Sequence, residues 1–126
     1  MRLLLDTSTF IWSVMSPERV SRVAVESMTE ENAVREISVL SLSEIAIKHA
    51  NGKLRFPKMD VEVGIEDLRL RILPYTANHA YEFFALPLRH TDPFDRMIIA
   101  QAISEGIPIV NSDGKFRLYK GLKVIW

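Results

Sequence analysis

The sequence contains no cysteine, which excludes disulfide bonds, thiolate metal sites and a cysteine nucleophile. It contains no apolar run near the roughly 18 residues that a membrane-spanning helix needs. No charged segment, apolar stretch and cleavage site precede the first predicted strand, so we expect no signal peptide and a soluble, cytoplasmic protein. The sequence also lacks a glycine-rich phosphate loop and a Gly-x-Ser-x-Gly motif, which argues against the usual nucleotide-binding and serine-hydrolase sites.

Neither sign of charge dominates the chain. Sixteen basic and sixteen acidic residues give a formal net charge of zero. Domains that hold nucleic acid over much of their surface are usually basic, so this balance argues mildly against such a protein. The balance is compatible with an enzyme that binds RNA transiently through a local patch. The three histidines show no metal-ligand spacing, and we expect two of them, His49 and His79, at the surface.

Apolar runs of strand length alternate with segments of helical periodicity along all 126 residues, which we expect to form one domain, 1–126. This alternation predicts an α/β fold with a mostly parallel sheet of four or five strands, helices on both faces and right-handed crossovers. The predicted strands are 2–5, 36–40, 71–74, 107–111 and 122–126. The predicted helices are 7–15, 18–30, 42–51, 60–70, 76–85 and 93–105.

Four acidic residues occupy equivalent places in this pattern. Asp6 and Asp113 each follow a predicted strand, whereas Glu44 and Asp95 lie in the first turn of predicted helices. In a parallel sheet, the carboxyl ends of the strands and the helix starts that follow them share one edge, where sites form. Four carboxylates at one edge repel each other unless a cation joins them. The pattern therefore predicts a divalent-metal site of oxygen ligands, suited to phosphodiester chemistry.

Each of these positions also has a purely structural interpretation. Ser41 and Glu44 match the Ser-x-x-Glu capping box, and Asp92 is well placed to cap the last predicted helix. Asp6 could cap the first helix, and Asp113 lies in a sequence typical of turns. Each acid is weak support by itself, so the prediction of a site depends on all four lying at one edge.

The motifs around these acids resemble a known family, the PIN-domain ribonucleases, and within it the VapC-type toxins of prokaryotic toxin–antitoxin pairs. The resemblance covers essentially the whole chain, and its most specific part is the segment 90–102. The matching segments are Leu3-Leu4-Leu5-Asp6-Thr7, Ser43-Glu44-Ile45-Ala46-Ile47-Lys48, His90-Thr91-Asp92-Pro93-Phe94-Asp95-Arg96 and the Asp113 that follows an Ile-Val pair.

The resemblance implies a three-layer α/β/α sandwich and an endoribonuclease that depends on Mg²⁺ or Mn²⁺ and is inhibited by a small cognate antitoxin. It also implies that the catalytic and metal-binding set is Asp6, Glu44, Asp95 and Asp113. The chain departs from the subgroup at three positions near the acids. Ser8 replaces a usual histidine, Ser43 a usual aromatic residue and Asn111 a usual threonine.

The chemistry we expect is metal-assisted hydrolysis of RNA phosphodiester bonds. Asp6 and Asp95 are the preferred direct ligands. Glu44 and Asp113 are second choices, which could act through water, on a second ion or in orienting the nucleophile.

Several further residues are expected to support the site. Thr7 and Ser112 could orient the ligands, and Asp92 matches the family motif without a defined role. Exposed basic side chains near the edge should hold the RNA; the candidates are Arg96, Lys115 and Arg117.

Three rival functions follow from the same sequence. A phospho-accepting receiver domain is disfavoured because Asp6 stands alone and Tyr75, not an aspartate, follows the third predicted strand. A PIN nuclease that processes RNA without an antitoxin is a nearer alternative, as is a PIN-like binding module that has lost catalysis. A small partner gene beside this one would favour the toxin.

We expect a homodimer as well as an antitoxin complex. The first predicted helix carries Phe10, Ile11, Trp12 and Val14, and it is too short to bury all of them in its own core. Some of these side chains should then face another chain.

Overall fold

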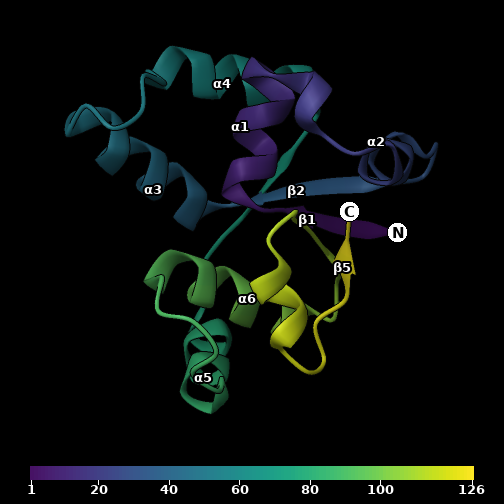
Figure 1. Ribbon diagram of the computed structural model, residues 1–126, viewed down its shortest axis with the longest axis vertical. Coiled ribbons are helices and arrows are strands. Elements are labelled where there is room, and N and C mark those ends of the chain that lie inside the picture. Colours follow the sequence, from purple (N-terminus) through teal and green to yellow (C-terminus); the bar gives the residue numbers. More distant parts are fainter.

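The computed structural model describes all 126 residues and contains one five-stranded sheet (Figure 1). All four strand pairs are parallel, and the strand order is β3-β2-β1-β4-β5. The strands are β1 (Arg2–Leu5), β2 (Val34–Ser38), β3 (Arg71–Leu73), β4 (Ile109–Val110) and β5 (Val124–Ile125). Parallel neighbours need crossover connections, and these are supplied by the helices between the strands. The predicted α/β class and the upper strand number are confirmed.

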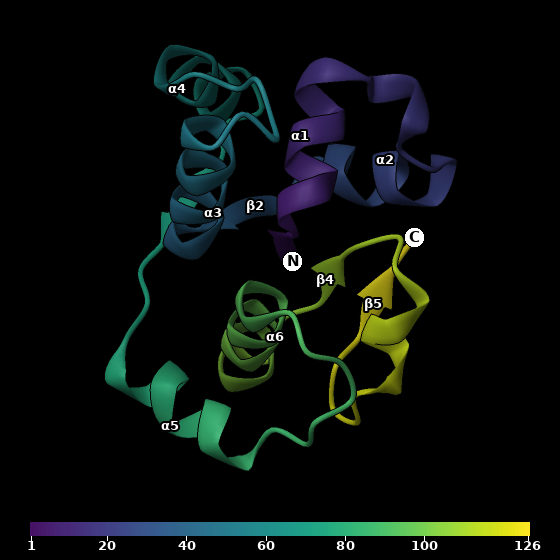
Figure 2. The same cartoon turned by 60° about the vertical axis from the view of Figure 1, so that its left-hand side comes forward.

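Helices cover both faces of the sheet (Figure 2). Four of them, α1 to α4, lie on one side, and α5 and α6 lie on the other. The helices are α1 (Thr7–Met15), α2 (Arg22–Thr29), α3 (Val39–Ala50), α4 (Lys58–Asp67), α5 (Ala77–Ala85) and α6 (Pro93–Glu105), with 3₁₀ helices at Pro17–Arg19 and Gly114–Leu118. The arrangement is the three-layer α/β/α sandwich that the family resemblance implies. None of these helices is both long and apolar enough to cross a membrane.

The central strand β1 feeds two separate cores because successive side chains of a strand point to opposite faces. Leu3 and Leu5 join the core beneath α1, α2, α3 and α4, where Phe10 is fully buried. Leu4 joins the core beneath α6, together with Ile98. The run of three leucines is therefore buried on both faces, which is typical of a parallel sheet. This burial holds the end of β1, and with it Asp6, in a fixed position.

Helix α6 begins and ends where its sequence predicts. The Asp92 carboxylate accepts a hydrogen bond from the Asp95 amide at 3.1 Å, and Pro93 occupies the first turn. Gly106 ends the helix in the left-handed conformation, with φ of 67°, which glycine adopts without strain. The middle of the helix, from Arg96 to Ala102, is largely buried because it lies between the sheet and α5. Asp95 therefore stands at the start of a rigid, well-anchored helix.

Helix α3 begins three residues earlier than predicted, and this corrects the interpretation of Glu44. Ser38, not Ser41, is the cap, because its hydroxyl accepts a hydrogen bond from the Leu40 amide at 3.0 Å. Val39 and Leu40, predicted as the end of a strand, form the first turn of the helix. Glu44 consequently lies in the second turn and makes no capping box. The structural alternative for this carboxylate is removed.

Other boundaries differ at the ends of elements. The segment 18–30 forms a 3₁₀ turn, Pro17–Arg19, and then α2, because the Ser21 hydroxyl accepts a hydrogen bond from the Ala24 amide and starts the helix there. Strands β4 and β5 each contain only two residues of the longer predicted runs. These shifts leave the element order unchanged.

His79 is fully buried, so its predicted surface position is wrong. Its Nδ1 accepts a hydrogen bond from the Thr76 amide at 3.1 Å, and its Nε2 lies 2.9 Å from a Glu105 carboxylate oxygen. Arg2 contacts the same carboxylate at 3.0 Å and also pairs with Glu36 through two hydrogen bonds. Both ring nitrogens have a hydrogen-bond partner, so the cost of removing them from water is offset and the ring can be buried. This network joins α5 and α6 to the sheet.

Candidate active site

One pocket at the carboxyl end of the sheet contains all four predicted acids. It has a volume of about 190 Å³ and lies where β1, β4, α3 and the start of α6 meet. Its lining residues are Asp6, Thr7, Ser8, Ile11, Glu44, Lys48, Asp92, Asp95, Asn111, Asp113 and Phe116. The fold thus brings together carboxylates that are separated by up to about a hundred residues in the sequence.

Asp6 is a buried carboxylate of which only one oxygen accepts hydrogen bonds. Its Oδ2 accepts hydrogen bonds from the Ser8 hydroxyl at 2.6 Å, from the Ser8 amide at 3.3 Å and from the Asn111 side-chain amide. Its Oδ1 is buried and has no partner. Burial raises the pKa of Asp6 above its usual range, and the Ser8 and Asn111 hydrogen bonds oppose that rise. Asp6 also caps α1, so its structural and functional interpretations coexist.

Glu44 shows the same division between one held oxygen and one free oxygen. It projects from α3 and is 5% exposed. Its Oε2 lies 2.8 Å from the Lys48 ammonium, one turn later on the same helix. Its Oε1 is buried without a partner. The hydrogen bond to Glu44 raises the pKa of Lys48, because the carboxylate stabilises the charged ammonium.

Asp95 has a strongly raised pKa. Burial, followed by the nearby carboxylates of Asp6, Asp92, Glu44 and Asp113, raises the pKa of Asp95 to about 8. One Oδ lies 3.5 Å from His90 Nε2, but burial lowers the pKa of His90, so this ring does not supply a full positive charge at neutral pH. Without a cation, the pocket therefore favours a proton on Asp95.

Asp113 and Asp92 stand at the exposed rim of the pocket. Asp113 caps the 3₁₀ helix, and its carboxylate accepts a hydrogen bond from the Lys115 amide at 2.9 Å. Its own amide donates to Asn111 Oδ1 at 2.5 Å. Asn111 thus contacts both Asp6 and Asp113, and it fixes the two acids that follow β1 and β4 relative to each other.

The proposed supporting residues fall into two groups. Thr7 lines the pocket, and its hydroxyl lies 2.7 Å from the buried Ser41 hydroxyl, which ties α1 to α3. Ser112 is exposed and does not line the pocket. Lys115 and Arg117 are exposed on the 3₁₀ helix that Asp113 caps, as an RNA-binding role requires.

Arg96 was predicted to be an exposed RNA-binding side chain, and this is wrong. It is 9% exposed, and its guanidinium donates hydrogen bonds to the backbone carbonyls of Pro87 and Leu86 and to the Tyr119 hydroxyl. A guanidinium offers five N–H donors in a fixed plane, which suits it to hold an irregular loop. Arg96 therefore anchors the segment that leads into Asp92 and α6.

Of the three residues that depart from the family pattern, two line the pocket. Ser8 and Asn111 are the side chains that hold Asp6, whereas Ser43 is exposed. Sequence reasoning did not single out Lys48 as a site residue. The i, i+4 spacing of Glu44 and Lys48 on one predicted helix was the signal that could have identified it.

The donor set fits a divalent cation. No group of three or more His, Asp or Glu side chains stands at metal-ligand spacing in this arrangement. Two buried carboxylate oxygens, Asp6 Oδ1 and Glu44 Oε1, nevertheless lack any hydrogen-bond partner. A buried anionic oxygen without a partner is costly, and a cation removes the cost. Hard oxygen ligands of this kind suit Mg²⁺ or Mn²⁺.

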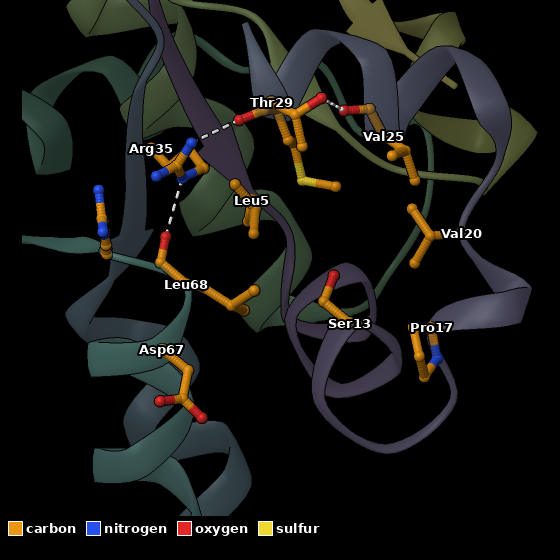
Figure 3. Close-up of a pocket in the computed structure, with 11 residues that line it drawn as sticks. Leu5, Ser13, Pro17, Val20, Val25, Thr29, Arg35, Asp67 and Leu68 are labelled. Atoms are coloured by element: carbon orange, nitrogen blue, oxygen red, sulfur yellow. Dashed lines mark hydrogen bonds between the residues drawn. The ribbon is translucent and has the colours of Figure 1, made fainter. Parts of the chain in front are cut away.

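A larger, mostly apolar cavity of about 430 Å³ lies on the α1–α4 side of the sheet (Figure 3). Leu5 of β1, Ser13 of α1 and Arg35 of β2 line it. The Arg35 guanidinium donates to the Leu68 carbonyl at 2.8 Å and to the Met28 carbonyl at 2.6 Å. The charged group of Arg35 is thus hydrogen-bonded within the chain. The remaining surface of the cavity is mainly apolar. It contains none of the four acids.

Comparison with known proteins gives matches to one family. The model of the PIN domain matches residues 3–122. Among curated proteins, none matches the sequence. The fold is similar to VapBC2 from Rickettsia felis bound to a promoter DNA fragment, with a TM-score of 0.79, 17% identity and coverage of 98% of this chain and 97% of that one. It is also similar to DNA-bound VapBC from Salmonella typhimurium, with a TM-score of 0.70, 21% identity and coverage of 98% and 96%.

A third similar structure is VapBC-5 from Mycobacterium tuberculosis, described as a member of the VapBC family of toxin–antitoxin systems. Its TM-score is 0.68 at 16% identity, and the match covers 98% of this chain and 97% of that one. Each match spans nearly the whole of both chains, so the similarity is one of complete folds and not of a shared fragment.

Proposed function

The chain belongs to the PIN domain family, and on that premise we propose that it is a divalent-metal-dependent endoribonuclease, the toxin of a toxin–antitoxin pair. The observation that carries the proposal is the acidic pocket. Asp6 and Glu44 each carry one buried, unpartnered oxygen, and both line a pocket that Asp95 and Asp113 also line. A binding module that had lost catalysis would have no need to keep four carboxylates together against their mutual repulsion.

Asp6, Glu44 and Asp95 are the residues that would hold the ion, with Asp113 at the rim as a further ligand or a ligand through water. When bound, Mg²⁺ or Mn²⁺ supplies a Lewis acid that withdraws charge from the phosphate and lowers the pKa of the attacking water. The chain itself supplies orientation. Ser8 and Asn111 hold Asp6 so that its second oxygen stays free, and the start of α6 holds Asp95.

Two basic residues follow the acidic pocket in the sequence. Lys115 and Arg117 lie on the 3₁₀ helix that Asp113 caps, and both are exposed. Exposed cations beside an acidic metal pocket can hold the phosphates that flank the scissile bond, although the net charge of the whole chain is zero. The proposed RNA contact is therefore local and depends on these two side chains together with the ion.

The test of the activity is RNA cleavage by the purified chain. We expect cleavage with Mg²⁺ or Mn²⁺. Cleavage should be lost when EDTA is added, because EDTA removes the ion that activates the water and the phosphate. A chain prepared identically with Asp6→Asn and Asp95→Asn together controls for contaminating nuclease. Equal cleavage by that double variant, or cleavage that persists in EDTA, would contradict the proposal.

The similar folds named above belong to toxin–antitoxin complexes, which supports an antitoxin as partner. The apolar cavity in Figure 3 is the surface we propose for an amphipathic antitoxin segment, because it reaches Leu5, the residue before Asp6. We expect the product of an adjacent small gene to co-purify with this chain and to inhibit cleavage. Val25→Glu, which places a charge at an exposed position of α2 that lines the cavity, should weaken that association, whereas Val63→Glu, at an exposed position of α4 that does not line the cavity, should not.

A homodimer remains part of the proposal. Phe10 is buried, whereas Ile11, Trp12 and Val14 pack against the core and are only half-buried, so part of their surface is free to face a second copy or the antitoxin. Phe84, 88% exposed on α5, is a further candidate for an interface. Light scattering measures the oligomeric state. An active chain without a partner gene, harmless when overproduced, would instead indicate the RNA-processing alternative.

A further inference from the structure

Lys48 is the only cationic side chain among the residues that line the acidic pocket. Its ammonium lies 2.8 Å from Glu44 Oε2. The side chain of Glu44 is only 6% exposed, whereas that of Lys48 is 43% exposed. The carboxylates of Asp92 and Asp95 also lie close enough to stabilise the charge on Lys48. A single, partly exposed cationic side chain thus lines a pocket of acids.

Lys48 differs from the other groups that hold the acids. The donors on Asp6 come from Ser8 and Asn111, which are neutral and can orient an oxygen without changing the net charge of the pocket. Lys48 orients Glu44 and also adds a full positive charge. A positive charge near a cation site opposes a second cation there, whereas a neutral donor does not.

The Lys48–Glu44 pair also differs from an ordinary surface pair on a helix. Arg22 and Glu26 have the same i, i+4 spacing and a similar distance of 2.9 Å, but their side chains are 91% and 64% exposed. Such exposed pairs contribute little because water screens them. The carboxylate of Glu44 is buried beside other carboxylates, so water screens its interaction with Lys48 far less.

We infer that Lys48 is a built-in counter-ion of the acidic pocket, which stabilises the metal-free protein and competes with the divalent cation for Glu44. The inference rests on the proposed function, since it concerns the same ion. Its consequence is a form of regulation. Lys48 compensates the charge of Glu44 while the pocket is empty, and the pocket loads only when the concentration of divalent cation is high enough to oppose the charge of Lys48.

The direct test is Mn²⁺ binding to the purified full chain, measured by titration calorimetry without RNA. We expect Lys48→Met to bind Mn²⁺ about tenfold more tightly than the unmodified chain, because a unit charge within roughly 6 Å of a divalent ion changes its affinity by that factor even at the dielectric constant of water. Lys48→Arg keeps the charge and should bind Mn²⁺ as the unmodified chain does. Arg22→Met removes the cation of the matched exposed pair and should have no effect.

The second readout is thermal unfolding. In EDTA, Lys48→Met should melt below the unmodified chain, because Glu44 loses its only counter-charge. In saturating Mn²⁺, the variant should recover and show the larger rise in melting temperature, since a ligand stabilises the form that binds it more tightly. These two shifts have opposite signs, which loss of packing by the Lys48 side chain could not produce.

Each outcome decides the inference. Tighter Mn²⁺ binding by Lys48→Met, with Lys48→Arg unchanged, supports it. Unchanged binding would show that Lys48 acts only as a surface pair, and weaker binding would show that it orients Glu44 as a ligand; either result overturns the inference while leaving the proposed nuclease intact. If neither chain binds Mn²⁺, the metal-dependent function itself fails, and the inference fails with it.

Discussion

Asp6→Asn and Asp95→Asn are each expected to lower the rate of metal-dependent RNA cleavage by at least about 10². Both carboxylates line the acidic pocket, and each projects from an element whose position the fold fixes, the end of β1 for Asp6 and the first turn of α6 for Asp95. A loss of about 2.7 kcal/mol of transition-state stabilisation gives this factor. The asparagine side chain keeps the size and one oxygen of the carboxylate but removes the charge that a divalent cation requires.

The matched control is Asp60→Asn. Asp60, like Asp95, lies in the first turn of a helix, but it is exposed on α4 and does not line the pocket. Its substitution should leave the rate unchanged. Steady-state cleavage of a labelled RNA in Mg²⁺, with melting curves to show that each variant is folded, gives the comparison. Full activity in either pocket variant would remove that residue from the proposed ligand set.

Metal-free stability is expected to fall as the pH rises from about 5 to about 8, and Asp95→Asn should remove a large part of that fall. Burial and the neighbouring carboxylates raise the pKa of Asp95 to about 8 in the folded chain, whereas an aspartate in an unfolded chain titrates near 3.9. Between these values the folded state holds a proton that the unfolded state has released. The free energy of unfolding therefore decreases with increasing pH, by up to about 1.4 kcal/mol per pH unit from this group.

Urea unfolding in EDTA at pH 5, 6, 7 and 8 measures this effect. The variant and the unmodified chain should be similarly stable at pH 5, where Asp95 is protonated and uncharged, and the variant should be the more stable at pH 8. Asp60→Asn should keep the pH dependence of the unmodified chain. Parallel curves for Asp95→Asn and the unmodified chain would show that Asp95 is already ionised across this range and that its pKa is not raised.

These two predictions assign opposite effects to the same substitution. Asp95→Asn should make the empty protein more stable and the enzyme less active, because the charge that repels its neighbours in the absence of a cation is the charge that binds the cation. Active sites commonly carry such a stability cost. A variant that loses activity through misfolding would lose both properties together, so the pair of measurements separates the two causes.

Local sequence determined much of this protein. The three leucines of β1 are buried on both faces because the strand period of two directs neighbours to opposite sides. The start of α6 follows from Asp92 and Pro93, and its end follows from Gly106. These features depend on residues within one turn or one strand of each other. The alternation of strands and helices then places Asp6, Asp95 and Asp113 at one edge, as the sequence predicted.

Tertiary structure decided which polar groups are buried and which partners they have. His79 is buried because Glu105, 26 residues away, accepts its hydrogen bond, and Asn111 reaches Asp6 across 105 residues. No local pattern encodes such pairs. The start of α3 was misassigned for the same reason: the Ser38 hydroxyl that caps it is also held by Gln101 of α6, 63 residues later. Local propensity sets where elements form, whereas the desolvation of polar groups is settled only when distant segments pack and supply, or fail to supply, a partner.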